Sequence, residues 1–199
     1  NSGAYDILVG TQMIAKGLNF PNVTLVGVIN ADSSLNIPNF RSSERTFSLI
    51  DQVTGRAGRV NKEGEAIVQT FNPDHYSIVC ASNHDYKTFF AKEMFIRKKL
   101  NYPPYCFITL IKISSKDFNY GIGEAKKISE FLKRSLSVAT TILGPSIANI
   151  LRINNNYNFQ VILKYKKDDK LYKALNELLK IYEGNSKIKV EFDFNPINL

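Results

Sequence analysis

The chain has 199 residues, of which 44% are hydrophobic, and its 26 Lys and Arg residues outnumber 18 Asp and Glu residues for a net charge of +8. This composition is that of an ordinary globular protein, and the length suffices for one or two hydrophobic cores. The longest apolar stretch, residues 23–29, is far shorter than the roughly 20 residues that cross a bilayer, and no signal-peptide pattern is present. We therefore expect neither a membrane-spanning nor a secreted protein.

The first half of the chain alternates between short apolar stretches and helical periodicity. This alternation predicts an α/β domain over residues 1–100 with a mostly parallel sheet, whose strands are buried on both faces. Asp85 is the expected N-cap of the second helix. The expected strands cover residues 6–9, 23–29 and 65–70, and the expected helices cover residues 42–56 and 85–100.

A second domain is expected over residues 101–199, because the adjacent Pro103 and Pro104 interrupt the helical pattern. Its elements follow the order βαββαβ, which predicts a ferredoxin-like α+β domain with two helices on one face of a four-stranded antiparallel sheet. Asn154 to Asn156 predict a turn. The expected strands cover residues 107–114, 140–143, 159–165 and 188–194, and the expected helices cover residues 123–138 and 171–182.

The cysteines and the charge distribution restrict the classes of site. Cys80 and Cys106 are 26 positions apart, so we expect two reduced thiols and no metal site formed by this chain. Residues 100–199 carry 15 basic and nine acidic side chains, a net charge of +6. Such an excess is typical of a surface that contacts nucleic-acid phosphates, but it is also typical of solvated helices.

Two stretches of the first domain carry chemistry beyond the fold. Residues 10–21 (GTQMIAKGLNFP) follow an expected strand and place backbone N–H groups and a hydroxyl where open α/β sheets bind ligands, phosphate among them. Residues 52–59 (QVTGRAGR) place two arginines three positions apart at the end of an expected helix. Such guanidinium groups hold polyphosphates and stabilise a transferred phosphoryl group. Taken singly, either stretch also fits a strand end or a surface turn.

In order and spacing these two stretches resemble motifs V and VI of superfamily 2 helicases, and the chain is more closely similar to the PriA family of replication-restart helicases. The resemblance covers nearly the whole chain. It implies that residues 1–100 are the C-terminal portion of a RecA-like helicase lobe 2, and that residues 101–199 are a PriA-type C-terminal domain. Further matching segments are residues 23–26, 30–32, 40–45, 64–70, 102–105, 143–145 and 194–196.

The resemblance also implies roles for single residues. Arg59 would be the arginine finger of ATP hydrolysis, and Arg56 would sense the γ-phosphate. Asn19 stands where many relatives have Asp, which weakens the expected ribose contact, and Lys16 would either neutralise phosphate or be a solvated loop lysine. The expected ATP-binding residues are Gly17, Asn19, Gln52, Arg56 and Arg59, and the expected contacts to single-stranded DNA are Thr11 and Gln12.

Basic and aromatic side chains of the second domain are candidates for contacts with branched DNA, or else are ordinary surface and packing residues. One basic group lies on the polar side of the helix expected at 123–138, and another lies at the end of the strand expected at 159–165. The aromatic group would stack on bases or pack the domain against the helicase lobe. The basic residues are Lys126, Lys127, Lys133 and Arg134, then Lys164, Lys166 and Lys167, and the aromatic residues are Tyr102, Tyr105 and Phe107.

Three family features do not occur in the sequence: a G-x-x-x-x-G-K-[ST] loop, an acidic D-E-x-x box and paired zinc-binding cysteines. We therefore expect the C-terminal part of a longer 3′–5′ DNA helicase that uses ATP and Mg²⁺, with zinc only in an upstream region, and no activity of this part alone.

The resemblance further implies a bacterial, cytoplasmic, nucleoid-associated protein without membrane contact. Its partners would be branched and single-stranded DNA, the single-stranded-DNA-binding protein and primosome loading proteins. Two alternatives remain: a non-catalytic basic adaptor that binds DNA or protein, and an RNA-directed helicase of the same superfamily.

Overall fold

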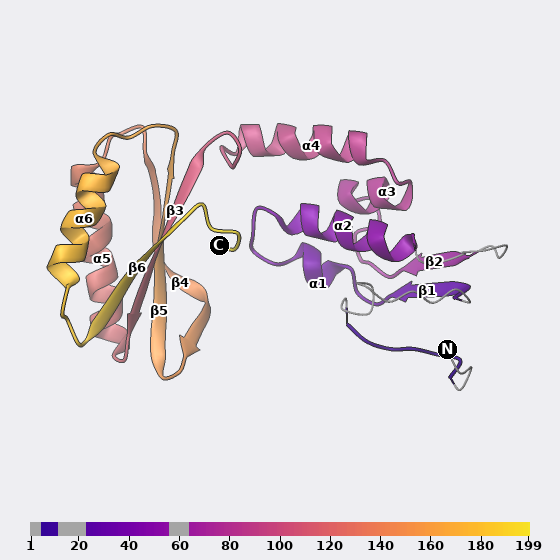
Figure 1. Cartoon of the computed structure of the whole chain (residues 1–199), viewed down its shortest axis with the longest axis horizontal. Coiled ribbons are helices and arrows are strands. Elements are labelled where there is room, and N and C mark those ends of the chain that lie inside the picture. The colour runs from indigo at the N-terminus through magenta and orange to yellow at the C-terminus, as the bar shows by residue number, and fades with distance from the viewer. Residues whose placement is uncertain (1–4, 12–22, 56–63) are drawn as a thin grey trace. The chain divides into compact units, whose positions relative to one another are not determined.

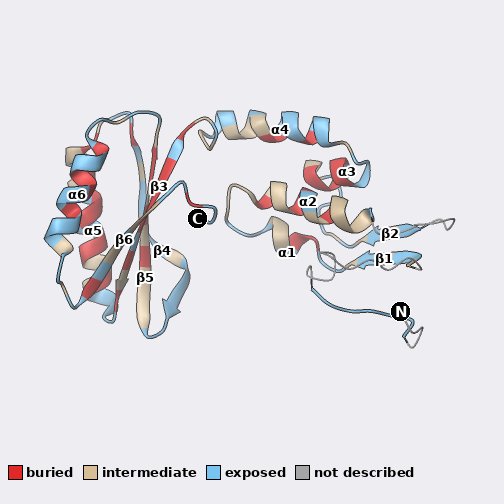
Figure 2. Ribbon diagram, viewed as in Figure 1, coloured by how far each residue is buried: buried red, intermediate tan, exposed pale blue. Residues whose placement is uncertain are grey.

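The computed structural model describes residues 5–11, 23–55 and 64–199. The chain divides into two compact units, Asn1–Ile96 and Arg97–Leu199, whose elements are labelled in Figure 1. Figure 2 shows that each unit has buried residues of its own, so each is described separately. No described helix is both long and apolar enough to span a membrane.

The first unit contains a small parallel sheet with helices. Strands β1 (Leu25–Val28) and β2 (Glu65–Val68) pair in parallel, with Leu25 opposite Glu65 and Val28 opposite Val68. Its helices are α1 (Asp32–Leu35), α2 (Ser42–Thr54), α3 (Tyr76–Ser82) and α4 (Tyr86–Lys99), the last of which continues into the second unit.

The core of the first unit is formed mainly by helices. Phe47 and Ile50 lie one turn apart on α2 and are both buried, and the Phe47 ring stacks on Phe89 of α4 with 4.2 Å between ring centroids. The Asp85 side chain accepts a hydrogen bond from the Thr88 N–H at 3.0 Å, which fits the expected N-cap of α4. The cluster comprises Ala31, Phe47, Ile50, Ile78, Cys80, Ala81 and Phe89.

The second unit has the predicted element order βαββαβ. All neighbouring strands are antiparallel in the order β4-β5-β3-β6, and α5 and α6 cover one face of this sheet (Figure 1). Ile111 and Ile113 of β3 pack in one core with Ile128 and Leu132 of α5. The elements are β3 (Phe107–Ser115), α5 (Phe118–Ser135), β4 (Thr141–Ile153), β5 (Asn156–Tyr165), α6 (Leu171–Tyr182) and β6 (Ile188–Phe194).

Several expectations about elements were wrong. The strands of the first unit are not buried on both faces, because no residue of β1 or β2 is fully buried. Helix α5 begins at Phe118 and ends at Ser135, whereas the sequence predicted residues 123–138. Residues 6–9 are exposed and form no strand, because within the described ranges only β1 and β2 pair in this unit and an apolar strand needs a partner. Strand β4 continues ten residues past its predicted end, since irregular pairing after Leu143 and after Ile147 interrupts the period-two pattern. Helices α1 and α3 were not predicted, because four and seven residues are too few for a clear helical period.

Candidate nucleotide and nucleic-acid site

The described part of the expected ATP site lies at the C-terminal end of helix α2. Gln52 is half-buried in its last turn, and the Thr54 hydroxyl donates to the Ile50 carbonyl at 2.9 Å. The N–H of Gly55 closes the helix by donating to the Asp51 carbonyl at 3.2 Å. The described helix therefore ends at Thr54 with Gly55 as its C-cap, two residues before the end that the sequence led us to expect.

Most of the other expected nucleotide contacts lie outside the described residues. Thr11 is exposed and is the last residue of the described segment 5–11. The roles given to the remaining residues stay predictions. These residues are Gln12, Lys16, Gly17, Asn19, Arg56 and Arg59.

The end of α2 is tied to the turn between α3 and α4. The Asp51 carboxylate lies 2.7 Å from Nδ1 of His84, and both side chains are partly exposed. At the opposite end of the helix, the Arg41 guanidinium pairs with Glu44 at 2.6 Å. Together with the buried Phe47 and Ile50, these contacts fix the helix that leads to the arginines.

Asp32 joins the segments that follow the two parallel strands. Its buried carboxylate accepts hydrogen bonds from the Phe71 N–H at 2.9 Å, the Asn72 amide at 3.0 Å and the Thr70 hydroxyl at 3.1 Å. These donors, the Phe71 N–H first, hold the pKa of Asp32 below its usual value. Asp32 thus has a structural role at the carboxyl ends of β1 and β2, which the sequence pattern alone did not reveal.

The basic face of α5 is mostly available for an anion. Lys126, Lys133 and Arg134 are exposed, whereas the Lys127 ammonium lies 2.7 Å from the Glu124 carboxylate. Burial works to raise the pKa of Glu124, but hydrogen bonds from Lys127 and Tyr182 hold it below its usual value. Lys127 is therefore largely compensated, and three of the four expected cations remain.

Lys164 does not belong to an exposed basic strand end. Only 7% of it is exposed, its Nζ donates to the Leu100 carbonyl at 2.8 Å, and the ammonium lies 3.7 Å from the centroid of the Tyr102 ring. Burial lowers the pKa of Lys164. The sequence suggested either a phosphate contact or a solvated lysine, and both are wrong for Lys164, although Lys166 and Lys167 are exposed.

Neither cysteine is exposed. The Cys106 thiol donates to the Asn101 carbonyl at 2.9 Å, and burial raises the pKa of this thiol. Across residues 5–11, 23–55 and 64–199, no three His, Cys, Asp or Glu side chains gather as metal ligands would.

Comparison with known proteins gives the same family over both units. Residues 1–61 match the helicase conserved C-terminal domain, and residues 98–197 match the primosomal protein N C-terminal domain. The replication restart protein PriA of Bacillus subtilis is 47% identical over 98% of this chain and 24% of its own length.

More distant relatives give the same result. The proteins of that name from Borreliella burgdorferi and Treponema pallidum are 39% and 34% identical, over 98% and 100% of this chain. The chain spans 29% and 30% of the lengths of these two proteins, so it covers 24% to 30% of the length of each of the three relatives.

Proposed function

Because this chain belongs to the PriA family of replication restart proteins, we propose that it is the C-terminal part of an ATP-dependent 3′–5′ DNA helicase that restarts stalled replication forks. One observation carries the proposal: the 47% identity runs through 98% of the chain, across both the helicase match and the PriA-specific match. An RNA-directed helicase of the same superfamily would not need the second match.

Unit 1 would be the C-terminal portion of a RecA-like lobe, with ATP held between it and polypeptide beyond this chain. The parallel pairing of β1 with β2 and the end of α2 at Thr54, two residues before Arg56, support this assignment. In it, Arg59 stabilises charge on the transferred phosphoryl group and Arg56 contacts the γ-phosphate. Gln52, Gly17 and Asn19 line the nucleotide, and Thr11 and Gln12 contact single-stranded DNA.

Unit 2 would be a ferredoxin-like DNA-binding domain, so that residues 1–100 and 101–199 form two functional domains. The strand order β4-β5-β3-β6 and the exposed cations of α5 support this assignment. Branched DNA, the single-stranded-DNA-binding protein and primosome loading proteins are the partners that this family membership suggests. The intact helicase would hydrolyse ATP in complex with Mg²⁺.

The helicase proposal is tested in a chimera, since the 199 residues contain no phosphate-binding G-x-x-x-x-G-K-[ST] loop. This chain would replace the matching C-terminal quarter of the Bacillus subtilis relative. We expect DNA-stimulated ATP hydrolysis from the chimera and none from the chain alone. Arg59→Ala should lower the turnover of the chimera by about 10³-fold or more, which is the usual contribution of an arginine finger, and leave DNA affinity nearly unchanged.

Arg134→Ala is the matched control, because it removes the same kind of charge from an exposed position on α5. It should leave the turnover at saturating DNA unchanged. If the Arg59 variant hydrolyses ATP as fast as the unsubstituted chimera, unit 1 is not a helicase lobe, and a non-catalytic adaptor becomes the better description.

A further inference from the structure

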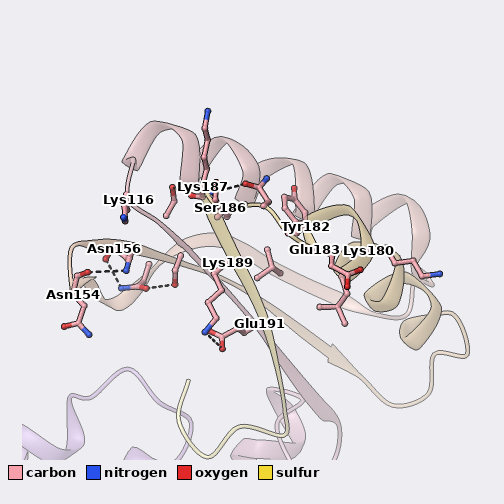
Figure 3. A pocket seen from close by; sticks show the side chains of 18 of the residues that line it. Lys116, Asn154, Asn156, Lys180, Tyr182, Glu183, Ser186, Lys187, Lys189 and Glu191 are labelled. Carbon is pink, nitrogen blue, oxygen red and sulfur yellow. Dashed lines mark hydrogen bonds and ion pairs between the residues drawn. The ribbon is translucent and has the colours of Figure 1, made fainter.

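A groove of about 1000 Å³ lies at one end of the four-stranded sheet of unit 2, beside strand β6 (Figure 3). Three connections meet there: the loop from β3 to α5, the hairpin from β4 to β5, and the loop from α6 to β6. The lysines come from the loop between β3 and α5 and from the region around the loop between α6 and β6, whereas the hairpin supplies asparagine side chains. We call it the basic loop groove, and its main polar residues are Lys116, Lys180, Lys187, Lys189, Asn154 and Asn156.

Four lysines and two glutamates, Glu183 and Glu191, line this groove, so its lining carries a net positive charge. Lys189 pairs with Glu191 at 2.8 Å. In contrast, Lys116, Lys180 and Lys187 have no ion pair with any described residue. The excess of lysine over glutamate in the lining favours an anionic ligand, and the +6 charge of this half of the chain would attract it over a longer range.

The loops that form the groove are held by hydrogen bonds. The Ser115 hydroxyl donates to the Lys187 carbonyl at 2.9 Å, which ties the end of β3 to the start of β6. The Lys187 N–H in turn donates to the Asn185 side chain at 3.0 Å. A surface that is ordered before binding loses less conformational entropy on binding, so these contacts favour a specific ligand site.

The lining favours the backbone of duplex DNA over unpaired bases. Sites for single strands combine a basic groove with exposed aromatic rings on which bases stack. Here Tyr182 is the one aromatic residue of the lining, and its hydroxyl donates to the Glu124 carboxylate at 2.8 Å. Lysine, asparagine and serine side chains make up most of the lining, and these are the groups that contact phosphates and sugars without reading the sequence.

We propose that the basic loop groove binds the sugar–phosphate backbone of duplex DNA, with Lys116, Lys180 and Lys187 each neutralising a phosphate. The inference rests on the proposed function, because it gives the DNA-binding role of unit 2 a location. This location differs from the α5 face that the sequence pointed to.

The test measures how the affinity of the full chain for a labelled duplex depends on salt. Each phosphate contact contributes about 0.9 to the slope of log affinity against log salt concentration, so the combined variant K116Q/K180Q/K187Q should reduce the slope by nearly 3. The matched control K92Q/K98Q/K99Q removes three exposed charges from α4, to which no DNA contact has been assigned, and should change the slope by less than about 1. The unsubstituted chain should bind the duplex more tightly than a single strand of the same length.

The outcomes separate the groove from the wider function. If the unsubstituted chain binds neither duplex nor single strand, the proposed DNA-binding role of unit 2 fails together with the groove. If it binds DNA but the α4 variant reduces the slope as much as the groove variant, the groove assignment alone is overturned. A tighter single-strand complex would overturn the duplex assignment. A poly-glutamate peptide that requires the groove lysines, with duplex affinity unaffected by their loss, would instead identify a docking site for an acidic protein.

Discussion

At the scale of single residues, Asp168 joins two connecting segments of unit 2, residues 136–140 and residues 166–170. Its carboxylate accepts hydrogen bonds from the Thr140 hydroxyl at 2.6 Å, the Ser137 N–H at 2.9 Å and the Lys170 N–H at 3.1 Å. Partial burial works to raise the pKa of Asp168, but these donors hold it below its usual value of 3.8. The ionised carboxylate therefore stabilises the fold, and protonation weakens it.

Asp168→Asn should lower the free energy of unfolding by about 1–3 kcal/mol at neutral pH, because the new amide nitrogen cannot accept a hydrogen bond and leaves at least one of the three donors without its acceptor. The folded-state pKa lies below 3.8, so the contribution of the carboxylate is complete above that pH and is lost as the pH falls through the folded-state value. Urea unfolding at a series of pH values should thus show the difference between parent and variant shrinking in acid.

The neighbouring Asp169 provides the control for this prediction. Its side chain is 83% exposed and lies 3.7 Å from the Lys167 ammonium, so Asp169→Asn should change stability by no more than about 0.5 kcal/mol. Equal losses in both variants would mean that the Asp168 hydrogen bonds contribute nothing specific.

At the scale of elements, one glycine sets how closely α5 approaches the sheet. A Cβ on Gly121 would lie 2.5 Å from Cε2 of Phe159 and 3.1 Å from Cβ of Ser115. Gly121→Ala should therefore destabilise unit 2 by about 1–3 kcal/mol, although alanine favours a helix by about 1 kcal/mol over glycine. Gly123 lies on the same helix with open space around its Cα, so Gly123→Ala should stabilise by about 0.5–1 kcal/mol.

Chemical denaturation followed by far-UV circular dichroism measures both alanine variants. Opposite signs are expected. Stabilisation by both substitutions would show that the gap between α5 and β5 is not restricted by Gly121.

Elements with a regular hydrophobic period were predictable from the sequence. The alternation through β6 and the stripe of Ile128 and Leu132 on α5 correspond to burial in the core. That residues 6–9 lack a strand partner could not be recognised from their own segment, because strand formation depends on neighbours distant in the chain. In contrast, Asp85 was predictable as the helix cap from the sequence, because its contact with Thr88 is local.

The candidate sites follow the same division between local and distant contacts. The position of Gln52 near the end of a helix was visible in its own segment. The burial of Lys164 was not, because its partner, the Leu100 carbonyl, is 64 positions away. The basic loop groove escaped detection for the same reason, since Lys116 and Lys187 meet only after β3 and β6 have paired.

At the scale of the whole molecule, the two units differ in how well their sheets are covered. In unit 2, Ile111, Ile113 and Val161 are completely buried. In unit 1, no residue of β1 or β2 is fully buried, and the flanking Ile29 and Phe71 are more than 80% exposed. Parallel sheets are normally covered on both faces, so the first unit should be the less stable part of the chain.

Hydrogen exchange followed by mass spectrometry of the full chain tests this difference. Amides of β3 and β5 should exchange only with global unfolding of unit 2, whereas amides of β1 and β2 should exchange at least about 100-fold faster, which corresponds to a difference of roughly 3 kcal/mol in opening free energy. In the chimera with the Bacillus subtilis relative, the same β1 and β2 amides should become strongly protected, because additional polypeptide would cover the exposed Ile29 and Phe71. Protection of β1 and β2 in the isolated chain equal to that of β3 would contradict this prediction and would mean that the two-stranded sheet is stable without further cover.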